Sequence, residues 1–195
     1  MPGPAADRPV TSQARPMPSA ARSWAIAIVA GPLALAVDQV SKWWILTEVM
    51  DPPRLIPITG FLNLTLGYNR GVSFGLLATD SPATPILLSG LAFAILPLMG
   101  WWLAKEPRPL HGAAFGLIAG GGLGNVVDRL RQGAVTDFID VHAAGYHWPA
   151  FNLADTAIFL GAALLIAATM RPLPAEAPAG TADRDGLAGA PRHDA

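Results

Sequence analysis

Four apolar runs divide the chain and decide what it can fold into. They lie at about residues 24–45, 83–103, 110–128 and 151–170, and each is close to the ~20 residues that an α-helix needs to cross a bilayer. The composition agrees, because 52% of the 195 residues are hydrophobic and only 14% are charged. We therefore predict a mainly α-helical membrane protein with four transmembrane helices.

The first run begins like a signal peptide but is too long to be one. Arg15 and Arg22 precede it, and Ala34-Leu35-Ala36 resembles a cleavage site. The apolar stretch nevertheless continues through Trp43 and Trp44, past the length of a signal-peptide core. We therefore expect this run to be retained as the first span.

The segments on either side of the four runs differ from them in composition. Residues 1–22 and 172–195 are rich in Pro and Ala and show no hydrophobic periodicity, which is typical of disorder. We therefore predict one membrane domain over residues 23–171, between two disordered cytoplasmic tails.

The distribution of basic residues predicts the orientation in the membrane. Eight lie in the two tails and in the loop between spans two and three: Arg8, Arg15, Arg22, Lys105, Arg108, Arg171, Arg184 and Arg192. Four lie in the other two loops: Arg54, Arg70, Arg129 and Arg131. By the positive-inside rule, this bias places both termini in the cytoplasm and the loops 46–82 and 129–150 on the outer, periplasmic side.

Two local patterns add detail to this outline. Apolar and polar residues alternate loosely over 54–68, which predicts short strands and a small periplasmic β-sheet between spans one and two. In the third span, Gly116, Gly120 and Gly124 recur every four residues. Small residues at this spacing allow two membrane helices to approach closely.

The composition excludes several kinds of site. The chain has no cysteine, so it has no disulfide, no thiol nucleophile and no cysteine-based metal site. Its four histidines do not form a His-Glu-x-x-His motif, which leaves a zinc protease without support. The net charge of −1 gives no indication of nucleic-acid binding.

Charged residues within the predicted spans are the main functional signal, because a carboxylate in a bilayer is costly unless it faces a protein interior or a wet cavity. Asp38 and Lys42 are four residues apart and therefore share one helix face. An ion pair between them would lower the cost of burying either charge, with Lys42 extending toward the outer surface. The alternative is a contact with substrate or phosphate.

Two pairs of an asparagine and an aspartate lie near the outer ends of spans three and four. Asn125 and Asp128 are three residues apart, as are Asn152 and Asp155, so each pair projects from one helix face. The amide could orient the carboxylate or bind a substrate carbonyl. Arg129 is the expected ion-pair partner of Asp128, which favours a structural role for that carboxylate.

A second carboxylate is available to Asp155. This residue has an apolar flank and no adjacent cation, which suits an acid or a pair of carboxylates that shares a proton. Asp137 and Asp140 lie in the outer loop before the fourth span. Either could fold back over that span, and their spacing does not choose between them. Two carboxylates at one site are the equipment for activating water in peptide hydrolysis.

A four-helix bundle with carboxylates at its outer end admits several functions: peptide hydrolysis, metal-dependent phosphotransfer to a lipid, and ion or proton transport. The Asp-x-x-Asp-Gly motif of CDP-alcohol phosphotransfer is absent, and no serine lies in a Gly-x-Ser-x-Gly elbow. No inverted repeat supports a transporter. Transport also needs a polar path across the bilayer, whereas these carboxylates gather on one side.

Five segments resemble, in order, the motifs of signal peptidase II, the lipoprotein signal peptidase family of bacteria. The segments are Asp38-Gln-Val-Ser-Lys42, Asn69-Arg-Gly-Val-Ser-Phe-Gly75, Gly124-Asn-Val-Val-Asp-Arg129, Val135-Thr-Asp-Phe-Ile-Asp140 and Phe151-Asn-Leu-Ala-Asp155. The resemblance covers about residues 24–170, and five ordered motifs on four matching spans are specific. Ser73 stands where many members of the family carry Ala.

The resemblance implies an aspartic endopeptidase of the bacterial inner membrane that needs no metal or other cofactor. It implies prolipoprotein substrates that carry diacylglyceryl and are cut just before the lipidated cysteine, with membrane lipid around the enzyme. The family's catalytic pair maps onto Asp137 and Asp155. Its supporting positions map onto Asp38, Lys42, Asn69, Gly71, Asn125, Asp128, Arg129 and Asn152.

The resemblance also implies two features of the outer loops. The strands at 54–68 are expected to form a sheet that cradles substrate. The residues after Asp140 are expected to form a lid-like helix.

Overall fold

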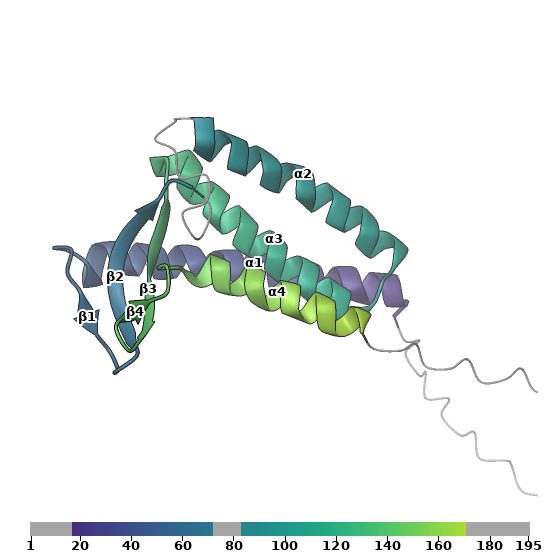
Figure 1. Cartoon of the computed structure of the whole chain (residues 1–195). Coiled ribbons are helices and arrows are strands. Elements are labelled where there is room, and N and C mark those ends of the chain that lie inside the picture. The colour runs from purple at the N-terminus through teal and green to yellow at the C-terminus, as the bar shows by residue number, and fades with distance from the viewer. Residues whose placement is uncertain (1–16, 72–82, 171–195) are drawn as a thin grey trace, which may run out of the picture.

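The computed structural model of the protein describes residues 17–71 and 83–170, which form four α-helices, one π-helical turn and four strands (Figure 1). Of the two tails that we predict to be disordered, only residues 17–22 are described. Ser73 also lies outside the described residues. The helices form a bundle, and the strands lie together at one end of it (Figure 1).

The helices are α1 (Ser19–Trp44), which continues into the π-helical turn η1 (Ile45–Val49), α2 (Ala83–Lys105), α3 (Pro109–Gln132) and α4 (Leu153–Thr169). α1 with η1, α2 and α3 are each long and apolar enough to cross a membrane. α4 has 17 residues and a length of about 25 Å, at the lower end of what a span needs. These helices confirm the predicted fold class, although α1 begins at Ser19, earlier than the expected start near residue 24.

The strands form one small antiparallel arrangement in the order β1-β2-β3-β4. They are β1 (Ile56–Pro57), β2 (Leu62–Asn69), β3 (Val135–Ala143) and β4 (Tyr146–His147). β1 and β2 confirm the predicted sheet in the loop after α1. β3 is an addition to that sheet: it pairs with β2 and so joins the loop before α2 to the loop before α4.

The prediction of a lid-like helix after Asp140 is wrong. β3 continues to Ala143, and a turn at Ala144 and Gly145 leads into β4. Both turn residues have positive φ angles, 50° and 81°, which suit a two-residue β-hairpin. Further along, Phe151 exchanges two backbone hydrogen bonds with Ile139, so the chain between β3 and α4 follows the sheet.

α3 is the central helix of the bundle and packs against α1, α2 and α4. Glycines make its closest approaches possible. A Cβ atom on Gly120 would meet the backbone carbonyl of Gly31 in α1, and a Cβ atom on Gly121 would meet the carbonyl of Ala154 in α4. The glycine-rich face of this span therefore brings α3 against two neighbours at once, as small residues do in membrane helices.

We expect Gly121→Ala to lower the melting temperature of the purified protein and Gly122→Ala to leave it unchanged or slightly raised. The new Cβ at position 121 meets the α4 backbone, and such overpacking costs ~1–3 kcal/mol. The Cβ at position 122 meets no atom within 4 Å, and Ala is the better helix former. Thermal unfolding in detergent measures both variants, and equal melting temperatures would contradict the α3–α4 packing.

Candidate active site

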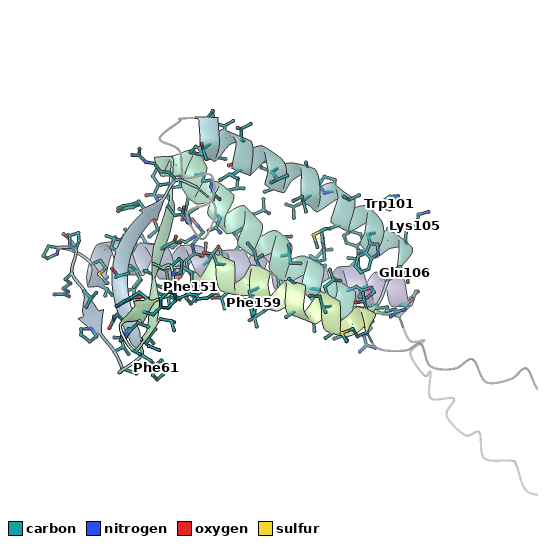
Figure 2. All side chains as sticks on the ribbon, viewed as in Figure 1. Phe61, Trp101, Lys105, Glu106, Phe151 and Phe159 are labelled. Carbon is teal, nitrogen blue, oxygen red and sulfur yellow. The ribbon has the colours of Figure 1, made fainter. Side chains whose placement is uncertain are left out.

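Polar side chains from α1, α3, β3 and α4 meet where the bundle joins the sheet. In Figure 2, Phe151 marks this junction, and Lys105 and Glu106 mark the opposite end of the bundle. Four aspartates are buried in the described part of the chain, and all lie at the junction: Asp38, Asp128, Asp137 and Asp140.

Asp137 lies on β3, opposite Gly67 of β2, and is 3% exposed. Its Oδ1 accepts a hydrogen bond of 2.6 Å from Asn152 Nδ2, and the Asn69 side chain also bonds to it. Burial and then the nearby charge of Asp155 raise the pKa of Asp137 to about 7. A carboxyl group with this pKa holds or releases a proton near neutral pH, as acid–base catalysis requires.

Asp155 lies in the first turn of α4, which is capped by Asn152. The side-chain oxygen of Asn152 accepts a hydrogen bond of 2.9 Å from the backbone N–H of Asp155, as is usual at an N-cap. The Oδ1 of Asp155 accepts a second hydrogen bond, of 2.8 Å, from Asn125 Nδ2 on α3. The cap and the contact with α3 together fix the direction of the Asp155 side chain.

Asn125 and Asn152 connect the two carboxylates. Asn152 Nδ2 donates to Asn125 Oδ1 at 3.3 Å, while each amide also donates to one aspartate. A hydrogen-bonded chain therefore runs from Asp137 through the two asparagines to Asp155. Asn152 has 0% of its surface exposed, so its amide is held in place on all sides. These contacts favour the orienting role for both amides over the binding of a substrate carbonyl.

Lys42 supplies a positive charge within this cluster. Its Nζ lies 2.8 Å from Asp38 Oδ2 and 2.9 Å from Asp128 Oδ2, and it donates to Asn125 Oδ1 at 3.1 Å. The predicted ion pair between Asp38 and Lys42 is confirmed. The expected extension of Lys42 toward the surface is wrong, because three acceptors hold it inside the protein with only 3% exposed.

The expected ion pair between Asp128 and Arg129 is also wrong. Asp128 pairs with Lys42 instead, at 2.9 Å. Adjacent residues on an α-helix point about 100° apart, so Asp128 and Arg129 face different neighbours. The partner of this carboxylate is therefore a cation on another helix, Lys42 of α1.

Arg129 lies beside the paired carboxylates. Its guanidinium donates to the backbone oxygen of Gly71 at 2.9 Å and interacts electrostatically with Asp155 and Asp137. Its buried Nε has no hydrogen-bond partner among the described residues. The N–H of Gly71 donates to Asn69 Oδ1 at 3.0 Å. The chain that follows β2 is thus attached to α3 next to the site.

Asp38 and Asp128, the two carboxylates that share Lys42, each accept a hydrogen bond from one backbone N–H. Asp38 Oδ1 accepts a hydrogen bond of 2.9 Å from Ala154, and Asp128 Oδ2 accepts one of 3.1 Å from Thr136. Each of these N–H groups belongs to the residue directly before one of the two paired aspartates. The ion cluster therefore fixes the backbone on both sides of the site.

Asp140, the alternative to Asp137, belongs to a different group. Its carboxylate accepts a hydrogen bond of 2.8 Å from Asn63 of β2, and His147 Nδ1 of β4 lies 2.9 Å from both oxygens. Burial by itself would raise the pKa of Asp140, but these hydrogen bonds outweigh it and lower the pKa. The structure brings Asp137, and not Asp140, to Asp155.

Several contacts to the aspartates come from residues that the sequence did not single out. They are Gln39, Asn63, Thr136 and His147. Only Gln39 carries a signal in the sequence, because a polar amide within an apolar span is itself unusual. The other three become neighbours of an aspartate through strand pairing or a backbone contact, which the spacing of residues does not reveal.

The chemistry that this arrangement supports is proton exchange between two carboxylates and a water or substrate group. One carboxyl group has a pKa near neutrality, and both are oriented by amides. In the described part of the chain, no group of three or more His, Asp or Glu side chains is placed to hold a metal ion.

Comparison with known proteins places the chain among bacterial membrane enzymes. The sequence model of the signal peptidase (SPase) II family matches residues 30–171. A lipoprotein signal peptidase of Azoarcus sp. (strain BH72) is 46% identical over 149 residues, which cover 74% of this chain and 82% of that protein. One of Ralstonia nicotianae is 45% identical over 143 residues, with 72% and 82% covered. A solved bacterial membrane enzyme superposes with a TM-score of 0.65 at 30% identity, covering 74% of this chain and 87% of its own.

We expect Lys42→Met to destabilise the protein by ~3–5 kcal/mol, because it leaves the carboxylates of Asp38 and Asp128 buried without their cation. Chemical or thermal unfolding in detergent measures this change.

Lys105→Met is the matched control for that measurement. Lys105 is exposed at the far end of α2, where its Nζ lies 5.7 Å from the centre of the Trp101 ring. An exposed cation–π contact contributes about 0.5–1 kcal/mol at most. If both variants lost stability equally, Lys42 would not be the centre of the buried cluster.

Proposed function

The chain belongs to the signal peptidase II family, and we propose that Asp137 and Asp155 are the catalytic pair of this aspartic endopeptidase. Its function is that of a lipoprotein signal peptidase, whose substrates are prolipoproteins. The observation that carries the assignment is the hydrogen-bonded chain from Asp137 through Asn152 and Asn125 to Asp155.

The pair holds one proton at neutral pH. Two carboxylates in a buried site do not both ionise easily, since each charge raises the cost of the other. The pKa of about 7 for Asp137, raised by burial and by Asp155, supports this state. The two groups titrate as a unit, so the shared proton belongs to the pair.

In the proposed reaction, the ionised carboxylate takes a proton from a water molecule, and the oxygen of that water attacks the scissile carbonyl carbon. The protonated carboxyl group donates a hydrogen bond to the oxyanion that develops and then gives its proton to the leaving amine. Asn125 and Asn152 orient the two carboxyl groups throughout. Arg129 adds positive potential beside the pair.

The proposed substrate carries diacylglyceryl on the cysteine that follows the scissile bond. Burial of its acyl chains contributes about 0.8 kcal/mol per CH₂ and holds that cysteine at the membrane surface. Asp155 lies in the first turn of α4, at the end of a span, which matches the depth of such a cut site. Membrane lipid is accordingly the second partner of the enzyme, and cleavage occurs just before the lipidated cysteine.

The proposed orientation puts both termini in the cytoplasm and the sheet with its catalytic pair at the periplasmic face of the inner membrane. The bias of basic residues toward the tails and the loop between α2 and α3 supports it. The buried aspartates of the described residues all lie at the sheet end of the bundle. This position favours a site that opens at one surface, because a path for ions would need polar groups across the whole membrane.

We expect Asp137→Asn and Asp155→Asn each to lower kcat by about 10²–10⁴-fold, because each removes one half of the proton exchange. Asn keeps the size of the side chain, so both variants should fold. Cleavage of a diacylglyceryl-prolipoprotein by the purified protein in detergent measures the loss.

Asp51→Asn is the control for this pair of substitutions, because Asp51 is exposed and makes none of the contacts of the site. It should cleave at the wild-type rate, with or without a chelator. Turnover by well-folded Asp137→Asn or Asp155→Asn within about twofold of the wild-type rate would remove that residue from the catalytic pair.

The pH dependence of cleavage follows from the pKa of Asp137. This pKa is raised to about 7, so the pair loses its last proton as the pH increases through that value. We expect kcat to fall about tenfold per pH unit on the alkaline side, while the protein stays folded. Initial rates between about pH 6 and pH 9 test this, and a flat profile over that range would contradict a shared proton.

A further inference from the structure

The side-chain amide of Gln39 lies between the two carboxylates that share Lys42. Its Nε2 is 3.0 Å from Asp128 Oδ1, 3.2 Å from Asp38 Oδ2 and 3.2 Å from the backbone oxygen of Gly124. All three neighbours are acceptors, so the NH₂ group, and not the amide oxygen, must face them. Gln39 therefore connects α1 to α3 by donating hydrogen bonds on both sides.

The two carboxylates that Gln39 joins are the ones that hold the catalytic segments. Asp38 accepts from the N–H of Ala154, the residue before Asp155, and Asp128 accepts from the N–H of Thr136, the residue before Asp137. A change in the separation of these two carboxylates would therefore change the separation of α4 from β3. That separation sets the distance between the catalytic groups.

The charges of the cluster explain why a neutral donor is needed here. Asp38 and Asp128 bring two negative charges against the single positive charge of Lys42. Two buried carboxylates with one cation between them repel each other. The Gln39 amide gives each carboxylate a further donor without adding charge, which limits that repulsion and holds the two groups at a fixed distance.

We propose that Gln39 is a positioning residue: its amide holds Asp38 and Asp128 together and thereby sets the spacing of the segments that carry Asp137 and Asp155. It does not touch the reacting atoms. The inference rests on the proposed function, because it presumes that Asp137 and Asp155 are the catalytic pair.

Gln39→Met tests the role directly, since Met keeps the length of the side chain and removes both donors. A positioning role predicts a kcat about tenfold to hundredfold lower, as for other small misplacements of catalytic groups, with KM within about twofold of the wild type. Rates are measured on diacylglyceryl-prolipoprotein well below the melting temperature of each variant, so that all of the enzyme is folded. Val40→Leu is the control, because Val40 is the next residue on α1 and is 62% exposed.

A normal kcat in folded Gln39→Met would overturn the proposal, and so would an effect on KM alone. Asp137→Asn, run in parallel, separates this failure from that of the proposed function. If Asp137→Asn stays active, the catalytic assignment fails; if it is inactive while Gln39→Met is normal, only the positioning role fails.

Gln39→Glu tests the positioning role of Gln39 if Gln39→Met does not fold. The charged groups around this position are Asp38 and Lys42 from α1 and Asp128 from α3, with Asp155 of α4 close to Asp38. An ionised Glu would repel the two carboxylates, whereas a protonated Glu donates one hydrogen bond to them. The activity of Gln39→Glu relative to the wild type should therefore rise several-fold as the pH is lowered from about 8 to about 5. A constant ratio would overturn the proposal.

Discussion

The ammonium group of Lys42, buried between Asp38 and Asp128, is the contact on which the rest of the site depends. Burying an ion costs several kcal/mol, and only close partners with good geometry offset that cost. Here the partners lie at 2.8 and 2.9 Å and come from two helices. Because each carboxylate also binds a backbone N–H, one cation fixes the relative positions of α1, α3, β3 and α4.

This ion cluster can form only because the helices approach each other closely. A Cβ atom on Gly124 would meet the carboxylate of Asp38, and a Cβ atom on Gly120 would meet the backbone of Gly31. Without a hydrophobic driving force between membrane helices, small residues and interhelical polar contacts are what bring them together. The glycines of α3 and the polar residues of α1 are therefore two halves of one interface.

The sequence predicted what depends on local composition and spacing and missed what depends on long-range pairing. The length of the apolar runs located the spans, and the four-residue spacing of Asp38 and Lys42 predicted their ion pair. Spacing assigned Asp128 to Arg129, its neighbour in the chain, because nothing in the sequence shows that Lys42 packs against α3. For the same reason, residue spacing did not distinguish Asp137 from Asp140 as the partner of Asp155. Only the pairing of β3 with β2 and with Phe151 decides which carboxylate faces α4.

The proposed catalytic pair, Asp137 and Asp155, combines two kinds of structural support. Asp155 comes from a helix of 17 residues, whose length of about 25 Å is slightly less than the ~30 Å of the hydrocarbon core. Asp137 comes from a strand of the sheet that covers the same end of the bundle. One carboxylate is thus held by the helical bundle and the other by the sheet, and Asn125 and Asn152 connect them. The proposed reaction uses both parts: water reaches the pair from the side of the sheet, and the lipid-anchored peptide bond reaches it from the side of the bundle.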